Sequence, residues 1–170
     1  MEAHIRDLLK YAPLDLSKSE RMGFRGLTRW LKSDDCYLRK MGVNAVELQP
    51  VYQFDSRSKS EYHWGYMPVN FFSPASDYAS NPEIASKECK ELFSAFHEAN
   101  LAVILDVVYN HVGIPNHLLN LDRELYLSTD ELGRLTNYSG CGNDLYCNAE
   151  PVKKMIIDSL KYWVLNYQVD

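Results

Sequence analysis

The sequence predicts an α/β fold: part of a (β/α)8 TIM barrel comprising its first three βα units. Strand and helix patterns alternate along the chain, the strand patterns are apolar enough to be covered on both faces, and long irregular segments follow the strands. No Gly-x-Gly-x-x-Gly follows a strand, which disfavours a dinucleotide-binding sheet. Because a complete barrel takes about 250 residues, we expect residues 1–170 to be the N-terminal part of one catalytic domain. We expect a long loop insertion after the third strand, over about residues 111–151, and a chain end where strand four begins.

The first βα unit and the strand after it occupy residues 2–50. Residues 2–9 predict a short strand, and residues 11–26, rich in Pro, Ser and Gly, predict a loop. Apolar residues at helical spacing predict a helix over residues 27–41, with Gly42 as its C-terminal cap. Residues 44–50 then predict a second buried strand.

The next elements follow the same alternation. Residues 51–81 predict a long connection, and loops of that length inside a domain are usually functional. Residues 82–99 predict a helix, because Asn81 can cap it and an apolar stripe runs along it. A third helix is predicted over residues 152–167 by apolar residues at helical spacing.

The third strand, predicted over residues 101–108, carries the polar side chains of greatest interest. It is almost wholly apolar and β-branched, which indicates burial on both faces, yet it includes Asp106. An unpaired buried carboxylate would cost several kcal/mol, so we expect Asp106 to meet a cation or several donors. Tyr109, Asn110 and His111 follow directly. The strand therefore delivers an acid, an amide and an imidazole at its carboxyl end, where active sites of α/β proteins lie.

The composition restricts the kinds of partner and the cellular location that we expect. A net charge of −5 argues against nucleic acid or an anionic membrane as the main partner. No apolar run approaches the roughly 20 residues of a membrane span, and no secretory signal is visible. The four cysteines form no Cys-x-x-Cys pair, so we expect reduced thiols in a cytoplasmic protein. Twelve tyrosines suit stacking against sugars or other flat ligands as well as a core.

Several ordered motifs are similar to one enzyme family. Asp106-Val-Val-Tyr-Asn-His111 resembles the first conserved region of the α-amylase superfamily, glycoside hydrolase family 13. Further stretches resemble its isoamylase, pullulanase and glycogen-debranching branch: residues 42–50, Trp64-Gly-Tyr66, Asn70-Phe-Phe-Ser-Pro74, residues 137–143, Tyr162-Trp163 and Val169-Asp170.

The resemblance implies roles for residues at matching positions. Tyr66 would stack on the glucose ring next to the scissile bond, and His111 would hydrogen-bond the same sugar. Asp106 would brace the active-site network, although a purely structural carboxylate is an equal alternative. Trp64 would either add to the sugar-binding wall or anchor its loop. Asn110 corresponds to a calcium ligand of many α-amylases and is a weak candidate here; no other cofactor is implied.

The resemblance also implies a reaction and a substrate. The family would hydrolyse α-1,6 branch bonds of glycogen, starch or pullulan with retention, using a nucleophile and a general acid about 5–5.5 Å apart. In the family pattern both carboxylates lie beyond Asp170, so we expect no catalytic residue here and no activity from this chain alone. The alternatives are a non-catalytic carbohydrate-binding remnant, an α-1,4-acting amylase or glucanotransferase of the same superfamily, and an unrelated parallel-sheet enzyme.

Overall fold

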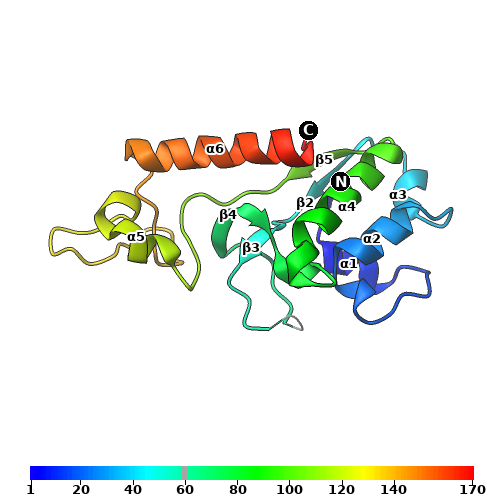
Figure 1. Ribbon diagram of the computed structural model, residues 1–170, viewed down its shortest axis with the longest axis horizontal. Coiled ribbons are helices and arrows are strands. Elements are labelled where there is room, and N and C mark those ends of the chain that lie inside the picture. Colours follow the sequence, from blue (N-terminus) through cyan, green and yellow to red (C-terminus); the bar gives the residue numbers. More distant parts are fainter. Residues whose placement is uncertain (59–60) are drawn as a thin grey trace.

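The computed structural model, which describes residues 1–58 and 61–170, is a mixed α/β structure (Figure 1). Its parallel sheet has the strand order β1-β2-β5, formed by Glu2–Ala3, Ala45–Leu48 and Ala102–Leu105. Both neighbours of β2 run parallel to it, with Ala45 opposite Ala102 and Leu48 opposite Leu105. The three predicted parallel strands are therefore adjacent, and their carboxyl ends meet at one edge. The α/β class is confirmed; closure into a barrel stays a prediction.

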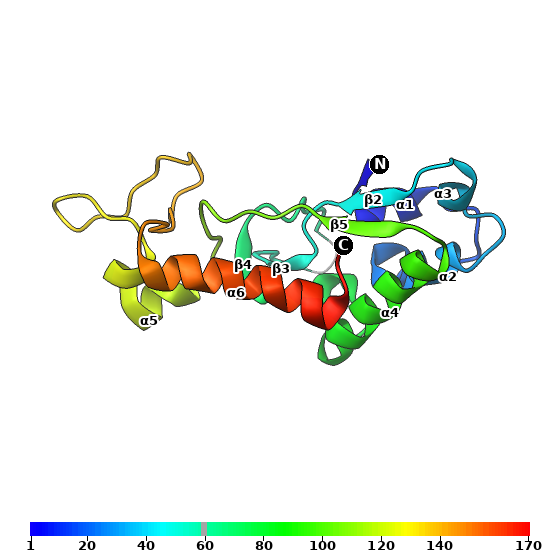
Figure 2. The same cartoon turned by 90° about the horizontal axis from the view of Figure 1, so that it is seen from above.

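The described part of the chain also contains six α-helices and a second sheet. Helices α2 and α4 lie side by side, and α4 also packs against β5 (Figure 2). The helices are α1 Ile5–Lys10, α2 Phe24–Leu31, α3 Tyr37–Lys40, α4 Ala85–Glu98, α5 His117–Tyr126 and α6 Glu150–Tyr167, with short 3-10 helices at Glu20–Met22, Ser76–Tyr78 and Pro82–Ile84. The second sheet pairs β3 Tyr52–Phe54 with β4 Pro68–Pro74 in antiparallel register.

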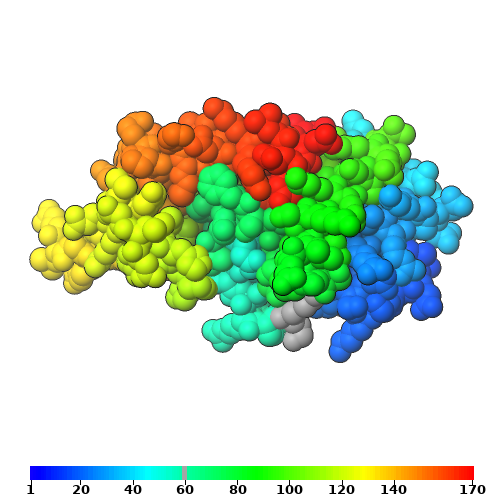
Figure 3. Space-filling model, viewed as in Figure 1, coloured from blue at the N-terminus to red at the C-terminus, as the bar shows by residue number. Residues whose placement is uncertain are grey.

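Two hydrophobic clusters hold these elements together. The larger lies between the parallel sheet and α1, α2 and α4, and includes Trp30, Phe93 and Trp163. The smaller joins Phe71 of β4 to Val152 of α6 and to the loops beside α5. In Figure 3, α5 and the loop after it form a projecting end of the molecule. Among the described residues, no helix is both long enough and apolar enough to cross a membrane.

The N-terminal predictions need correction. Of residues 2–9, only Glu2–Ala3 is strand, and a helix follows, because Ile5, Leu8 and Leu9 repeat at helical spacing and all three are buried. The helix predicted over 27–41 begins earlier, at Phe24, and is split into α2 and α3 by residues 32–36, which include the turn-forming Ser-Asp-Asp. Gly42 follows α3 with a φ of +73°, as its predicted capping role requires.

Three further segments differ from expectation. Residues 51–81 contain the β3–β4 hairpin, which was missed because register shifts interrupt its alternating pattern. Residues 111–151 contain α5, which Asn116 caps by accepting a hydrogen bond from the backbone of Leu119. The strand predicted over 101–108 is paired only at Ala102–Leu105. Its Ile104 is 45% exposed, whereas Val103, which points to the opposite face of the sheet, is fully buried. The expected burial on both faces is therefore wrong, because only the face that carries Val103 is covered.

Candidate functional site

A tyrosine and a carboxylate from distant parts of the chain meet at the carboxyl edge of the parallel sheet. Asp106 directly follows β5, and its backbone N–H donates to the carbonyl of Leu48 at 2.9 Å, which extends the β2–β5 pairing by one step. Tyr66 lies in the connection between β3 and β4, and its hydroxyl donates to Asp106 Oδ2 at 2.5 Å. Asp106 is half-buried and this is its one side-chain contact among the described hydrogen bonds. In place of the expected cation or several donors, Asp106 has a single phenol donor and partial exposure to solvent.

His111 joins the same group from the segment after β5. Its Nε2 donates to the backbone carbonyl of Tyr66 at 2.9 Å and lies 3.3 Å from the sulfur of Met67. Its Nδ1 lies 2.9 Å from Asn110 Oδ1. The side chain is only 4% exposed, and both ring nitrogens already have partners in the chain. Contact between His111 and a sugar stays a prediction, and a sugar hydroxyl would have to share or displace one of these bonds.

The loop that presents Tyr66 depends on a glycine. Gly65 has a φ of +89°, and a Cβ there would lie 2.7 Å from the carbonyl oxygen of Pro50. Both facts exclude a larger residue at this turn. Trp64, just before it, is 58% exposed, so it does not anchor the loop by burial. A role for Trp64 in sugar binding stays a prediction.

The phenol of Tyr66 remains a hydrogen-bond donor over the whole pH range in which proteins are studied. Burial raises the pKa of Tyr66 well above its ordinary value, and the adjacent Asp106 carboxylate raises it further. The hydroxyl therefore stays protonated and directed at Asp106, while the aromatic face carries no charge. Such a ring is suited to stack on the apolar face of a sugar.

Sequence reasoning missed three residues that position this group. Tyr52 of β3 accepts a hydrogen bond from the backbone N–H of Val108 at 2.7 Å, which fixes the segment after β5. Asp55 and His63 flank the Tyr66 loop, and His63 Nε2 lies 3.0 Å from Asp55 Oδ1. In the sequence, the one signal for His63 is its position directly before Trp64. No sequence pattern links His63 to Asp55.

Within residues 1–58 and 61–170, no group of three or more His, Cys, Asp or Glu side chains could hold a metal ion. The amide oxygen of Asn110, the weak calcium candidate, is turned toward His111. A calcium role for Asn110 stays a prediction.

The four cysteines are free thiols in the described chain. Cys36 and Cys89 are buried, and burial raises the pKa of each thiol above its ordinary value. Cys141 and Cys147 are exposed, and partial burial also raises the pKa of Cys147. A raised pKa disfavours the nucleophilic thiolate, so none of these three thiols is a candidate nucleophile.

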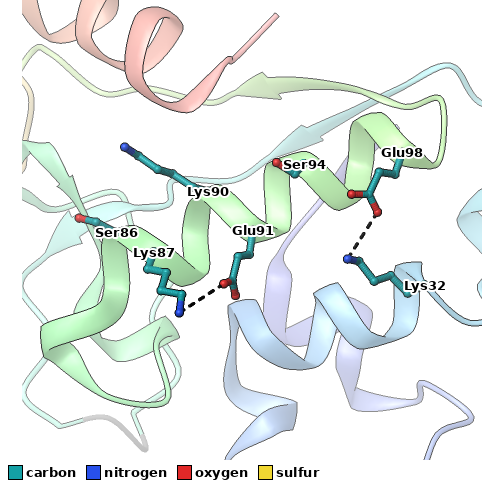
Figure 4. Close-up of a pocket in the computed structure, with 7 residues that line it drawn as sticks. All are labelled: Lys32, Ser86, Lys87, Lys90, Glu91, Ser94 and Glu98. Atoms are coloured by element: carbon teal, nitrogen blue, oxygen red, sulfur yellow. Dashed lines mark ion pairs between the residues drawn. The ribbon is translucent and has the colours of Figure 1, made fainter.

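A hollow on the outer face of α2 and α4 is separate from the Tyr66 group. Figure 4 shows it lined by lysine, glutamate and serine side chains of these two helices. Two ion pairs lie across it: Lys87 is 3.8 Å from Glu91, and Lys32 is 3.4 Å from Glu98. These exposed pairs contribute little to stability, and the hollow contains none of the residues predicted to bind substrate.

Comparison with protein families and curated sequences finds clear relatives. The family model described as alpha amylase, catalytic domain, matches residues 17–123. Isoamylase 3, chloroplastic, of Oryza sativa subsp. japonica is 41% identical over a region that covers 79% of this chain and 20% of the relative. The glycogen operon protein GlgX homolog of Mycobacterium tuberculosis is 35% identical, over 99% of this chain and 25% of the relative. The chain thus spans about a quarter or less of the length of these two relatives.

Solved structures give the same picture. A pullulanase from Paenibacillus barengoltzii in complex with maltohexaose and alpha-cyclodextrin matches with a TM-score of 0.86 and 30% identity, covering 99% of this chain and 29% of that one. A pullulanase from Anoxybacillus sp. LM18-11 complexed with maltotetraose matches with a TM-score of 0.86 and 32% identity, covering 99% and 27%. The similarity therefore includes nearly every residue of the chain described above.

Proposed function

Because this chain belongs to the alpha-amylase catalytic-domain family, we propose that the protein containing it is a debranching glycoside hydrolase that acts on α-glucans. The relatives that support this proposal are isoamylases, a pullulanase and the GlgX homolog. The substrates would be glycogen, starch or pullulan, and the bond cleaved would be the α-1,6 branch bond. Cleavage with retention would need two carboxylates about 5–5.5 Å apart.

The proposal assigns this chain the first three strands of a (β/α)8 barrel and one wall of the sugar site. The parallel order β1-β2-β5 supports the barrel, since consecutive barrel strands pair in sequence order. The family pattern puts the nucleophile and the general acid after Asp170. We therefore propose that the chain binds sugar without cleaving it, so that it releases no reducing ends from pullulan or glycogen.

The single observation that carries the proposal is the contact among Tyr66, Asp106 and His111. Residues 40 and 45 positions apart come together, so that the hydroxyl and the carbonyl of Tyr66 are both held. With its hydroxyl occupied by Asp106, the tyrosine offers its ring face to a ligand. A fixed aromatic ring loses little conformational entropy when it stacks on a sugar, which favours binding.

Titration with maltotetraose tests this assignment. Trp64 is the exposed tryptophan, while Trp30 and Trp163 are buried, so a change in tryptophan fluorescence reports binding beside Tyr66. We expect a saturable change in the wild-type chain. Tyr66→Ala should weaken binding at least tenfold, whereas Tyr66→Phe should retain most of it, because the ring remains.

Tyr11→Ala is the matched control, since Tyr11 is an exposed tyrosine at the end of α1, outside the proposed site. It should leave the affinity unchanged. A flat titration in the wild-type chain, or equal loss from Tyr11→Ala and Tyr66→Ala, would contradict the sugar-binding role. Release of reducing ends from pullulan by the purified chain would contradict the placement of the catalytic groups beyond it.

A further inference from the structure

The Tyr66 loop is held on its outer side by a second polar group, which the proposed function does not use. His63 stands three residues before Tyr66, and its ring stacks on Phe54 at a centroid distance of 4.6 Å and an interplanar angle of 11°. Its Nδ1 accepts a hydrogen bond from the backbone N–H of Gly65 at 2.9 Å, and its Nε2 lies 3.0 Å from Asp55 Oδ1. The imidazole thus spans the turn that presents Tyr66.

These two bonds define the tautomer of His63. Because Nδ1 accepts from a backbone N–H, it carries no proton, so the proton of the neutral ring lies on Nε2 and is donated to Asp55. A ring with its proton on Nδ1 would oppose the Gly65 N–H and leave Asp55 without this donor. The Gly65 turn and the Asp55 carboxylate therefore select one state of the ring.

Asp55 extends the connection to the segment that carries His111. Its Oδ2 accepts a hydrogen bond from the backbone N–H of Ile114 at 3.2 Å. The neighbouring Gly113 allows this approach, since a Cβ there would lie 2.8 Å from Asp55 Oδ2 and 2.6 Å from the carbonyl oxygen of Met67. The side chains of Asp55 and His63 are only 17% and 18% exposed, so their bonds are shielded from competing water.

We propose that Asp55 and His63 are positioning residues of the sugar site, and that they set the orientation of the Tyr66 ring relative to His111. One carboxylate oxygen holds the turn of the Tyr66 loop through His63, and the other holds the segment after β5 through Ile114. No described hydrogen bond joins either residue to Asp106. The predicted effect on sugar affinity rests on the proposed function. The predicted effect on the geometry of the Tyr66 loop is independent of it.

Three substitutions at His63 test its individual contacts. His63→Phe keeps a planar ring on Phe54 and removes both polar bonds. His63→Asn retains an acceptor near the position of Nδ1 for Gly65, and His63→Gln retains a donor near the position of Nε2 for Asp55. The matched control is His97→Phe, because His97 also pairs with a carboxylate, Asp170, at 2.8 Å, but lies on α4.

Two readouts test positioning without any ligand. Nitrogen-15 NMR of the imidazole should find His63 with its proton on Nε2 and Nδ1 unprotonated. Acrylamide quenching of Trp64, adjacent to His63, should increase in His63→Phe and not in His97→Phe, although both variants lose a histidine–carboxylate pair. His63→Asn and His63→Gln should each restore part of the wild-type protection.

A third readout is the affinity for maltotetraose. We expect His63→Phe to weaken this affinity about tenfold, because the hydrogen bonds that order the Tyr66 loop are lost. The thermal unfolding midpoint of His63→Phe should be no lower than that of His97→Phe. If wild-type and His63→Phe bind equally and Trp64 quenching is unchanged, the proposal is overturned. A His63 proton on Nδ1 also overturns it. If the wild-type chain binds no sugar, the proposed function fails, and the tautomer and quenching results still decide whether the pair positions the loop.

Discussion

Asp144 is a buried carboxylate that shows how surrounding donors decide the ionisation of a single residue. Burial alone would raise its pKa, but hydrogen bonds from the Ser139 hydroxyl, the Tyr138 backbone, the Thr136 hydroxyl and the Ser139 backbone outweigh it and hold the pKa of Asp144 below its ordinary value of 3.8. The donors lie 2.5 to 3.2 Å from its two oxygens. The negative charge therefore organises the loop between α5 and α6.

The depressed pKa of Asp144 predicts a specific pH dependence of stability. Its contribution is fully present above pH 3.8 and is lost as the pH falls through the lower, folded-state pKa. Asp144→Asn should lower the free energy of unfolding at pH 7 by about 1–3 kcal/mol, because one oxygen becomes an amide that cannot accept. Urea unfolding across pH 2–7 measures this: the difference between variant and wild type should shrink below pH 3.8. The exposed Glu131→Gln serves as the control and should follow the wild-type profile.

The carboxylate of Asp106 has a different environment from that of Asp144. Asp106 has one neutral donor and is only half-buried, so it retains unoccupied acceptor capacity at the edge of the sheet. Asp144, by contrast, accepts from four donors within its own loop. We therefore propose that Asp106 is the carboxylate that responds to a bound sugar, whereas the four donors around Asp144 give it a structural role.

At the scale of elements, side-chain hydrogen bonds define the start of α4. Asn81 accepts a hydrogen bond from the backbone of Glu83 at 3.1 Å, and Pro82 occupies the first turn of the 3-10 helix that leads into α4. Glu88, in the first turn of α4, accepts from the backbone of Ser80 at 2.8 Å. The Asn81 bond satisfies an N–H group that helix geometry leaves without a partner, and the Glu88 bond fixes the residue just before the cap.

Removing the Asn81 cap should destabilise the chain measurably. Asn81→Ala should lower the free energy of unfolding by about 1 kcal/mol, because the N–H of Glu83 loses its acceptor. Asn81→Asp should retain stability, since the carboxylate accepts the same bond and its charge is favourable at a helix N-terminus. Chemical unfolding of the three proteins provides the measurement. Equal loss from both variants would show that the amide group of Asn81, and not its acceptor oxygen, matters.

At the scale of the whole molecule, α6 ties the two hydrophobic clusters together. Its Val152 end packs in the smaller cluster, and its Trp163 and Tyr167 end packs in the larger. The indole N–H of Trp163 donates to the carbonyl of Phe71 in β4 at 2.8 Å, in a buried setting. After α6, the backbone of Asp170 donates to Val103 of β5 at 3.0 Å, next to the parallel sheet.

Trp163→Phe tests this bridging role. The smaller ring leaves a cavity, and the carbonyl of Phe71 loses its donor, so we expect a loss of about 2–4 kcal/mol. Leu165→Ala, on the exposed face of the same helix, should change stability by less than about 0.5 kcal/mol. Thermal unfolding followed by circular dichroism compares the two. If Leu165→Ala proved as costly as Trp163→Phe, the assignment of the loss to the buried contact between Trp163 and Phe71 would be contradicted.

Much of the scaffold follows from local patterns in the sequence. The helical spacing over residues 152–167, the capped pattern after Asn81 and the apolar strand at residues 44–50 each correspond to an element of the structure. The family resemblance carried by the Asp106 to His111 motif is confirmed by the family model and the relatives. These features are predictable because hydrophobic periodicity and capping act between residues only a few positions apart.

The tertiary structure alone decided which side chains meet. The sequence by itself determined the positions of the three parallel strands, of α4 and α6, and the order of the motifs. The family resemblance, and not a local pattern, indicated that Tyr66, Asp106 and His111 belong to one site. The sequence did not predict the β3–β4 hairpin, which returns the chain so that Tyr66 reaches Asp106, nor the pairing of Asp55 with His63. The physical reason is that a periodic pattern specifies one element's buried face, whereas a contact across 40 residues depends on how several such faces pack against one another.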